Sequence, residues 1–267
     1  MTLCTKLFKR IFSTFGMSVL KSSTLATLEI KASDNSHSDL KFVQAIEPIH
    51  QKSVLENLDK SKSQLRQDLF VLSQLNWKRQ GFFVEFGATN GCDLSNTFLL
   101  EADFNWTGIL AEPAISWREA LIKNRPTARL DFRGVWRESG ASVTFLESSE
   151  PELSTIESFR KADLHAKSRK RRKDTYEVKT ISLLDLLIEH QAPKIIDYLS
   201  IDTEGSEYEI LSTFDFDKFT FSIITVEHNF TSNREELFTL LSENGYERRL
   251  SDISSFDDWY VFVGPKK

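Results

Sequence analysis

In four stretches of this chain an apolar run ends at or near a carboxylate residue, and a turn with two glycines follows the first of them. Phe82–Phe86 is apolar except for Glu85, and Gly87 and Gly91 follow it. A short apolar run that stops at a glycine is typical of a buried strand in a parallel sheet. The two glycines permit a sharp bend and a close approach of the backbone to a ligand. Open α/β sheets bind nucleotide-like ligands at such strand ends.

The glycine spacing disfavours two phosphate-binding motifs. A dinucleotide fold requires G-x-G-x-x-G, but Thr89 and Cys92 occupy the second and third glycine positions. A P-loop requires Gly-Lys-Ser/Thr where Cys92 and Asp93 stand, and Asp93 would repel a phosphate. A ligand with a ribose and a positive centre suits this turn better. S-adenosylmethionine is such a ligand.

A second predicted strand, Gly108–Ala111, leads to Glu112. Glu112 falls about 20 residues beyond the glycine turn, where a carboxylate commonly accepts hydrogen bonds from ribose hydroxyls. Pro113 cannot extend the strand and suits the first turn of a helix. Taken alone, Glu112 is also compatible with a solvated strand end. Its interval from the turn favours a ligand contact.

Two later strands supply further polar groups. Ile195–Ile201 leads to Asp202 and Glu204, and Phe221–Val226 leads to Glu227 and His228. Because parallel strands end at the same edge of a sheet, these side chains are expected to converge with Glu85 and Glu112. Glu207 and Glu209, in the next predicted helix, are expected to be solvated.

The chain resembles the FkbM-type S-adenosylmethionine-dependent methyltransferases in six segments: VEFGATNGCDLSNT, GILAEP, TISLLDLL, DYLSIDTEGSEYEIL, ITVEHNF and LLSENGYE. The resemblance covers roughly residues 64–264. It implies methyl transfer, usually to a hydroxyl and often of a sugar, with Asp202 facing the transferred methyl or the acceptor. It implies an adenine site beside residues 132–136, where a strand and a helix are expected, with Asp131 and Glu138 the nearby acids. The cofactor contacts it implies are Glu85, Gly87, Ala88, Asn90, Gly91, Glu112, Pro113 and Asp202.

Methyl transfer to a hydroxyl requires alignment of the acceptor and removal of its proton. His228 is the first candidate for the base, because the ordinary pKa of histidine is about 6.5. A structural histidine at the rim of the sheet is the alternative interpretation. Asp202 is the second candidate, as a base or as a group that orients the acceptor, and Glu227 completes the catalytic set.

A divalent metal is a further hypothesis. Asp202, Glu204 and Glu227 offer oxygen ligands of the kind that Mg²⁺ prefers, and such an ion could acidify the acceptor. The same carboxylates could instead satisfy helix N-termini or bind the amino group of the cofactor.

Strand and helix patterns alternate along the chain, which indicates right-handed crossovers and a parallel sheet. With the resemblance, they predict a Rossmann-like class I methyltransferase fold: a mostly parallel seven-stranded sheet with an antiparallel edge strand, and helices on both faces. Asp258–Val263 is the candidate for the antiparallel strand. Helices are expected from Ser63, over Leu183–Ile188, and from a cap at Ser232 to near Gly245.

We expect an N-terminal arm at 1–62, partly helical or disordered, and a methyltransferase domain at 63–267 with a basic loop near 160–175. The arm places apolar residues at four-residue spacing from Leu3 to Val19. It suits a membrane-surface or organellar targeting helix, or packing on the domain or a partner. The basic run Lys167–Lys173 suits a solvated loop, an acceptor-binding lid or a nuclear address.

Composition restricts the function classes. A net charge of −5 offers no general attraction to nucleic acid. Two cysteines far apart in sequence form no metal or disulfide pattern. No apolar run approaches the ~20 residues of a membrane-spanning helix, and a cytoplasmic location is expected. Two other functions stay open: a catalytically silent binding or trafficking module with this fold, and an NAD-dependent oxidoreductase.

Overall fold

The computed structural model describes residues 38–148, 154–156 and 172–265. The chain divides into two compact units, Met1–Val43 and Gln44–Lys267. Every strand of the described residues belongs to the second unit. The apolar positions Leu3 to Val19 and most of the basic run lie outside the described residues. The last two residues of that run, Arg172 and Lys173, begin a strand, so the basic loop predicted near 160–175 ends earlier than expected.

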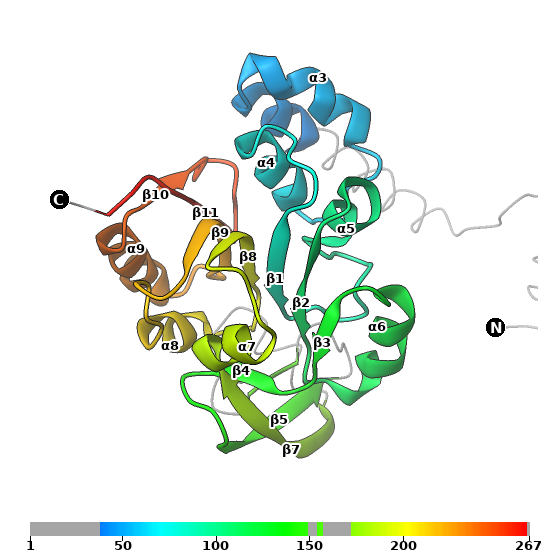
Figure 1. Cartoon of the computed structure of the whole chain (residues 1–267), viewed down its shortest axis with the longest axis vertical. Helices are drawn as coiled ribbons and strands as arrows, with labels where there is room; N and C mark the ends of the chain where they lie inside the picture. Colours follow the sequence, from blue (N-terminus) through cyan, green and yellow to red (C-terminus); the bar gives the residue numbers. More distant parts are fainter. Residues whose placement is uncertain (1–37, 149–153, 157–171, 266–267) are drawn as a thin grey trace, which may run out of the picture. The chain divides into compact units, whose positions relative to one another are not determined.

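The main sheet has seven strands in the order β10-β11-β9-β8-β1-β2-β3 (Figure 1). Strands β3, β2, β1, β8 and β9 are parallel, and β11 is antiparallel to both of its neighbours. This confirms the predicted mostly parallel sheet. The predicted antiparallel strand is β11, with β10 on its outer side. The strands are β1 (Phe82–Phe86), β2 (Thr107–Ala111), β3 (Arg129–Asp131), β8 (Ile195–Ile201), β9 (Thr220–Glu227), β10 (Tyr246–Arg249) and β11 (Asp257–Phe262).

Helices cover the sheet on both faces. Figure 1 shows α5 and α6 on one side of the main sheet and α8 and α9 on the other. No described helix combines the length and apolar character that crossing a bilayer would need. The helices are α3 (Pro48–Asn57), α4 (Gln67–Gln74), α5 (Phe98–Phe104), η1 (Ile115–Trp117), α6 (Arg118–Asn124), α7 (Leu183–Glu189), α8 (Glu207–Ser212) and α9 (Asn233–Glu243).

Helix boundaries follow local chemistry. The helix expected from Ser63 begins only at Gln67, because Arg66 has a φ of 67°, which a right-handed helix excludes. The Ser182 hydroxyl accepts a hydrogen bond from the Asp185 N–H and caps α7, the predicted buried helix. Helix α9 follows Ser232 as expected, but the Ser232 side chain makes no capping bond.

The topology reverses between β1 and β8. From β1 the chain winds outward through β2 and β3, and it then returns to β8 and winds toward β9. Ligands bind at such a switch point, in the crevice beyond the carboxyl ends of the strands. All five residues of β1 are buried, so this edge is rigidly supported.

A second sheet, inserted between β3 and β8, has the order β4-β7-β5-β6. Figure 1 shows β4, β5 and β7 at the lower end of the main sheet. The strand expected around residues 132–136 is β4, but no helix accompanies it, since residues 137–141 form a turn into β5. The strands are β4 (Gly134–Trp136), β5 (Ser142–Ser148), β6 (Thr155–Ile156) and β7 (Arg172–Ser182).

Candidate active site

A cavity of about 390 Å³ lies at the carboxyl ends of β1, β2, β8 and β9. Its volume suits a small-molecule ligand, since such sites typically measure about 300–1,000 Å³. The loops that follow the strands of the main sheet supply mostly polar lining residues. The second sheet supplies Gly134, Val135, Val143, Phe145 and Val178, which form an apolar wall. The cavity therefore has one wall suited to a flat apolar group and one suited to polar groups.

The turn after β1 fits closely against the end of β8. Gly87 has a φ of +71°, and a Cβ atom there would meet the Asp202 carbonyl oxygen at 1.9 Å. Only glycine allows this approach. The Gly87 N–H donates to the Ala111 carbonyl at 3.1 Å, which joins the turn to β2 as well. Gly87 and Asp202 both line the cavity.

Glu112 lines the cavity directly after β2. It is buried, and its two carboxylate oxygens accept hydrogen bonds from the Thr89 N–H at 2.9 Å and the Ala114 N–H at 2.7 Å. Burial, with the Asp202 and Glu147 carboxylates nearby, raises the pKa of Glu112 to about 7. Each oxygen keeps acceptor capacity for one more donor. Glu112 can therefore hold two vicinal hydroxyls of a ligand.

Four of the predicted cofactor contacts do not line the cavity: Glu85, Ala88, Asn90 and Gly91. The Glu85 carboxylate is buried and accepts hydrogen bonds from the Asn96 N–H at 2.7 Å and the Thr97 hydroxyl at 2.5 Å. Since Asn96 itself lines the cavity, Glu85 shapes this wall from behind.

Asn90 and Gly91 stabilise the glycine turn. The Asn90 Oδ1 atom accepts hydrogen bonds from the N–H groups of Cys92 and Asp93, both at 2.9 Å. A Cβ atom at Gly91 would meet the side chains of Leu121 and Arg125 at 2.6 Å. Gly91 therefore permits α6 to pack against the turn. Pro113, in contrast, lines the cavity.

Three carboxylates converge at the ends of β8 and β9. One oxygen each of Asp202, Glu204 and Glu227 lies within 4.8 Å of the others. The Glu227 Oε2 atom is buried and has no hydrogen-bond partner among the described residues. Burial, followed by the Asp202 and Glu204 charges, raises the pKa of Glu227 well above its ordinary value. Such a cluster favours an added proton or a cation.

Glu207 holds the loop that carries this cluster. Its Oε1 atom accepts hydrogen bonds at 3.0 Å from the N–H groups of Thr203 and Gly205 and from the Thr203 hydroxyl. The Glu207 side chain is buried, so the expectation that it is solvated is wrong. The carboxylate replaces the missing hydrogen-bond partners at the start of α8.

His228 does not line the cavity. Its Nδ1 atom accepts a hydrogen bond from the Phe230 N–H at 3.0 Å, and its Nε2 atom lies 3.8 Å from an Asp258 oxygen. Burial lowers the pKa of His228, which favours the neutral ring. The geometry does not support the predicted role as the general base, because both ring nitrogens face protein groups. It matches the alternative of a structural histidine at the sheet rim.

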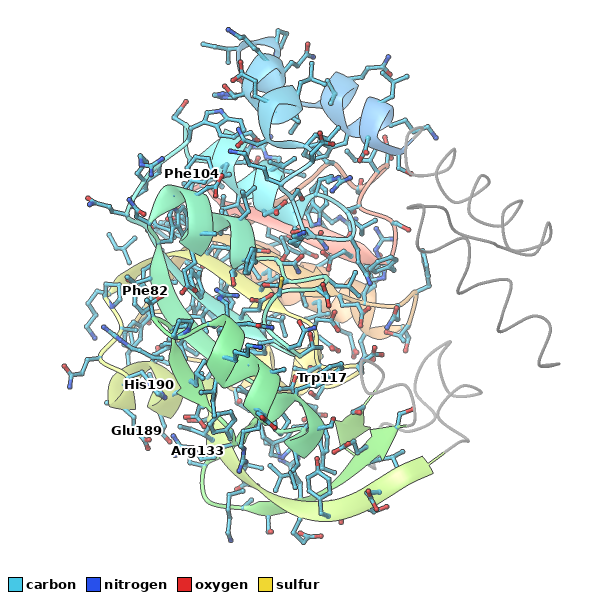
Figure 2. The ribbon with its side chains drawn as sticks, turned by 90° about the vertical axis from the view of Figure 1, so that its right-hand side faces the viewer. Phe82, Phe104, Trp117, Arg133, Glu189 and His190 are labelled. Carbon is cyan, nitrogen blue, oxygen red and sulfur yellow. The ribbon has the colours of Figure 1, made fainter. Side chains whose placement is uncertain are left out.

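Asp131 and Glu138 do not reach the cavity either. The Asp131 carboxylate binds the Arg133 guanidinium at 2.6 Å and the His190 ring at 3.0 Å, and Arg133 also binds Glu189. Figure 2 shows Arg133, Glu189 and His190 beside one another. This ion cluster joins the end of β3 to the end of α7, and the cavity wall next to it is the apolar one.

Sequence reasoning missed Gln64, Gln67 and Asp257, which line the cavity. Asp257 begins a strand instead of ending one, so the search for acids at strand ends passed over it. The antiparallel pairing of β11 with β9 places Asp257 opposite Glu227. Gln67 is the first residue of α4, and no motif marked it.

The solved structures that are similar to this chain include three methyltransferases. Precorrin-6y C5,15-methyltransferase from Geobacter metallireducens is 13% identical, with a TM-score of 0.38 over 68% of this chain and 71% of that one. A TehB-like SAM-dependent methyltransferase from Corynebacterium glutamicum is 9% identical, with a TM-score of 0.37 over 83% and 100%. The CurJ carbon methyltransferase is 9% identical, with a TM-score of 0.38 over 91% and 70%.

No curated protein matches the chain. Residues 85–260 match the family described as the methyltransferase FkbM domain. The match covers the glycine turn, both strand ends that form the acidic cluster, and most of β11. The chain therefore belongs to the FkbM family of S-adenosylmethionine-dependent methyltransferases.

Proposed function

We propose that the protein transfers the methyl group of S-adenosylmethionine to a hydroxyl oxygen of a sugar, a glycan or a sugar-bearing metabolite. The observation that carries this proposal is that Glu112 and the acidic cluster of Asp202, Glu204 and Glu227 line the same cavity. A carboxylate that can hold vicinal hydroxyls thus lies next to carboxylates that can orient an acceptor and accept its proton.

The residues present fit the cofactor. Glu112 would hold the ribose hydroxyls, and the turn from Gly87 to Thr89 leaves room for the sugar. The apolar wall around Val135 and Phe145 would pack on the adenine. The acidic cluster provides negative charge for the sulfonium and the amino group. When bound, S-adenosylmethionine supplies a methyl group activated for in-line displacement.

Asp202 is the residue we propose to act on the acceptor. It is the least enclosed of the three clustered acids, and Glu227 beside it has a raised pKa. A protonated Glu227 would leave Asp202 as the anion that orients the acceptor hydroxyl and takes its proton. The acceptor oxygen then forms its bond to the methyl carbon while the sulfur–carbon bond breaks.

The test is transfer of a tritiated methyl group from S-adenosylmethionine into carbohydrate and metabolite fractions. Asp202→Asn should lower the rate by about 10²-fold or more, the usual worth of a positioned base. Its affinity for S-adenosylhomocysteine, measured by calorimetry, should stay within about threefold. Asp217→Asn, an exposed acid outside the cavity, is the matched control.

Two outcomes would contradict the proposal. Equal labelling by the wild type and Asp202→Asn would remove Asp202 from the mechanism. Binding of S-adenosylhomocysteine without labelling of any fraction would favour a binding module instead. Mass spectrometry of the product shows whether the labelled methyl group is bound to an oxygen, and this tests the proposal that a hydroxyl oxygen is the acceptor.

We also propose that Mg²⁺ binds between Asp202, Glu204 and Glu227. The support is the 4.8 Å grouping of their oxygens and the unpartnered, buried Glu227 Oε2 atom. In that state Glu227 would be ionised, because the cation would take the place of its proton, and the ion would acidify an acceptor hydroxyl. Removal of divalent ions with EDTA should then lower the transfer rate, and added Mg²⁺ should restore it. An unchanged rate in EDTA would show that the carboxylates act without an ion.

A further inference from the structure

Two residues from distant parts of the chain form a polar pair on the cavity wall. The Gln67 Nε2 atom donates a hydrogen bond to the Asp257 Oδ2 atom at 3.0 Å. Gln67 is 3% exposed and Asp257 is 4% exposed, and both line the cavity. Gln67 precedes residues 85–260, which match the family. This chain therefore completes its cavity with a side chain from outside the matched domain.

Other protein groups hydrogen-bond to both side chains of the pair, but some of the pair's hydrogen-bonding capacity is not used within the protein. The Asp257 Oδ2 atom also accepts a hydrogen bond from the Trp259 Nε1 atom at 3.0 Å. The Gln67 Oε1 atom accepts one from the Leu65 N–H at 2.9 Å. Among the described residues, the Gln67 Nε2 atom makes one hydrogen bond and the Asp257 Oδ1 atom makes none. Because Asp257 Oδ2 accepts two hydrogen bonds, a proton on this carboxyl lies on Oδ1, so the pair offers a ligand an amide N–H donor and a carboxyl O–H that can both donate and accept.

The start of α4 is anchored independently of any ligand. Asp68, fully buried beside Gln67, accepts hydrogen bonds from the Ser61 hydroxyl at 2.6 Å and the Lys62 N–H at 3.3 Å. The Asp68 N–H in turn donates to the Ser63 hydroxyl at 3.2 Å. These contacts fix the position of Gln67. A preorganised polar group discriminates between ligands more sharply than a mobile one.

The pair lies on the acceptor side of the cavity. Asp257 pairs in register with Glu227 across the β9–β11 ladder, and Glu112 lies on the other side of β1 and β8. A ligand hydroxyl can accept a hydrogen bond from the amide N–H and form a second one with the carboxyl O–H. A methylene group at the same position of the ligand can do neither, and it would leave the Gln67 N–H and the Asp257 carboxyl without a hydrogen-bond partner from the ligand.

We propose that Gln67 and Asp257 together recognise a second hydroxyl of the acceptor, one that is not methylated, and so select a polyhydroxylated acceptor. This inference rests on the proposed function and specifies its substrate class. The acid cluster acts on the reacting hydroxyl, and the Gln67–Asp257 pair determines which neighbouring hydroxyl must be present.

The test compares methyl transfer to a panel of neutral methyl glycosides with transfer to their single-deoxy counterparts. For the wild type, one deoxy position should lower kcat/KM by at least tenfold. Gln67→Leu and Asp257→Leu should each reduce that discrimination to less than about threefold, mainly through a higher KM for the intact glycoside. Their effects in the double variant should be smaller than the sum, because the two residues act as a pair.

Gln51→Leu is the matched control, since Gln51 has one side-chain hydrogen bond, to the Ile46 carbonyl, and does not line the cavity. It should leave the discrimination unchanged. Calorimetry with S-adenosylhomocysteine should give wild-type affinity for all variants and so confirm their folding. Retained discrimination in both Gln67→Leu and Asp257→Leu would overturn the pair's role alone. Failure of the wild type to methylate any glycoside would overturn the proposed function and this inference together.

Discussion

At the scale of single residues, the proposed contact between Glu112 and the cofactor should make cofactor binding depend on pH. The pKa of its carboxyl is raised to about 7 by burial and by the Asp202 and Glu147 charges. Ribose hydroxyls donate more strongly to the ionised carboxylate than to the neutral acid. Below pH 7 the free protein must therefore lose a proton from Glu112 to bind the cofactor, and the affinity should fall.

We expect the dissociation constant of S-adenosylhomocysteine to rise up to about tenfold for each pH unit below 7, and to level off above it. Calorimetry at pH 6 and pH 8 measures this directly. Glu112→Gln should bind more weakly at pH 8 and should lose most of the pH dependence. A full pH dependence in Glu112→Gln would assign the proton to another group.

Some of the residues that line the cavity could be identified from the sequence, but for other candidates the sequence did not indicate which way the side chain points. Gly87, Glu112, Asp202 and Glu227 line the cavity because the ends of parallel strands necessarily meet at one edge. Glu85 also lies on a central strand, but its carboxylate binds loop N–H and hydroxyl groups. A sequence gives the type and spacing of an acid, whereas the partner that it selects depends on how loops pack in three dimensions.

At the scale of secondary-structure elements, two glycines provide a matched pair of tests. Gly87 and Gly140 have φ angles of +71° and +81°, but a Cβ atom would strike the Asp202 backbone at Gly87 and would meet nothing within 4 Å at Gly140. Gly140→Ala should lower the free energy of unfolding by about 1–2 kcal/mol, the cost of the left-handed conformation.

Gly87→Ala should lower the free energy of unfolding by about 2–5 kcal/mol, since the end of β8 must also move. It should abolish binding of S-adenosylhomocysteine, which Gly140→Ala should leave intact. Urea unfolding and calorimetry measure the two effects. Equal destabilisation by both substitutions would show that the turn and β8 are not tightly packed.

The two sheets differ in how far the sequence predicts them. Alternating strand and helix patterns predict the main sheet, because each crossover follows from local periodicity. The second sheet depends on antiparallel pairing between β5 and β7, with Phe145 opposite Tyr176. The register between two strands that lie far apart in the sequence cannot be predicted from local periodicity. The sequence of the basic run in this region allowed an acceptor-binding lid as one interpretation, but it did not predict a sheet that forms the apolar wall.

At the scale of the whole molecule, buried carboxyls should make stability depend on pH. The pKa of Asp257 is raised to about 8. Burial is the largest cause and the Asp202 and Asp258 charges add to it, whereas the hydrogen bonds from Gln67 and Trp259 lower the pKa. Glu112 behaves similarly. The folded chain keeps these protons at pH values where the unfolded chain, with ordinary pKa values of 3.8 and 4.5, has lost them.

The folded state thus binds more protons than the unfolded state between about pH 4 and pH 8, and stability falls as pH rises through this window. We expect the ligand-free protein to unfold at a lower temperature at pH 8 than at pH 6, by about 2–4 °C for each kcal/mol lost. Asp257→Asn should flatten this dependence in thermal unfolding curves. A melting temperature that rises toward pH 8 would contradict the expectation.

The direction of β11 has a consequence for how such enzymes diversify. Because β11 runs against its neighbours, its first residue lies at the reactive edge, and Phe256 in the connection before it lines the cavity too. Changes in the length or composition of that connection would alter which molecule is methylated without disturbing the donor half of the fold. New acceptor preferences can therefore evolve in this connection while the machinery for the methyl donor is inherited intact.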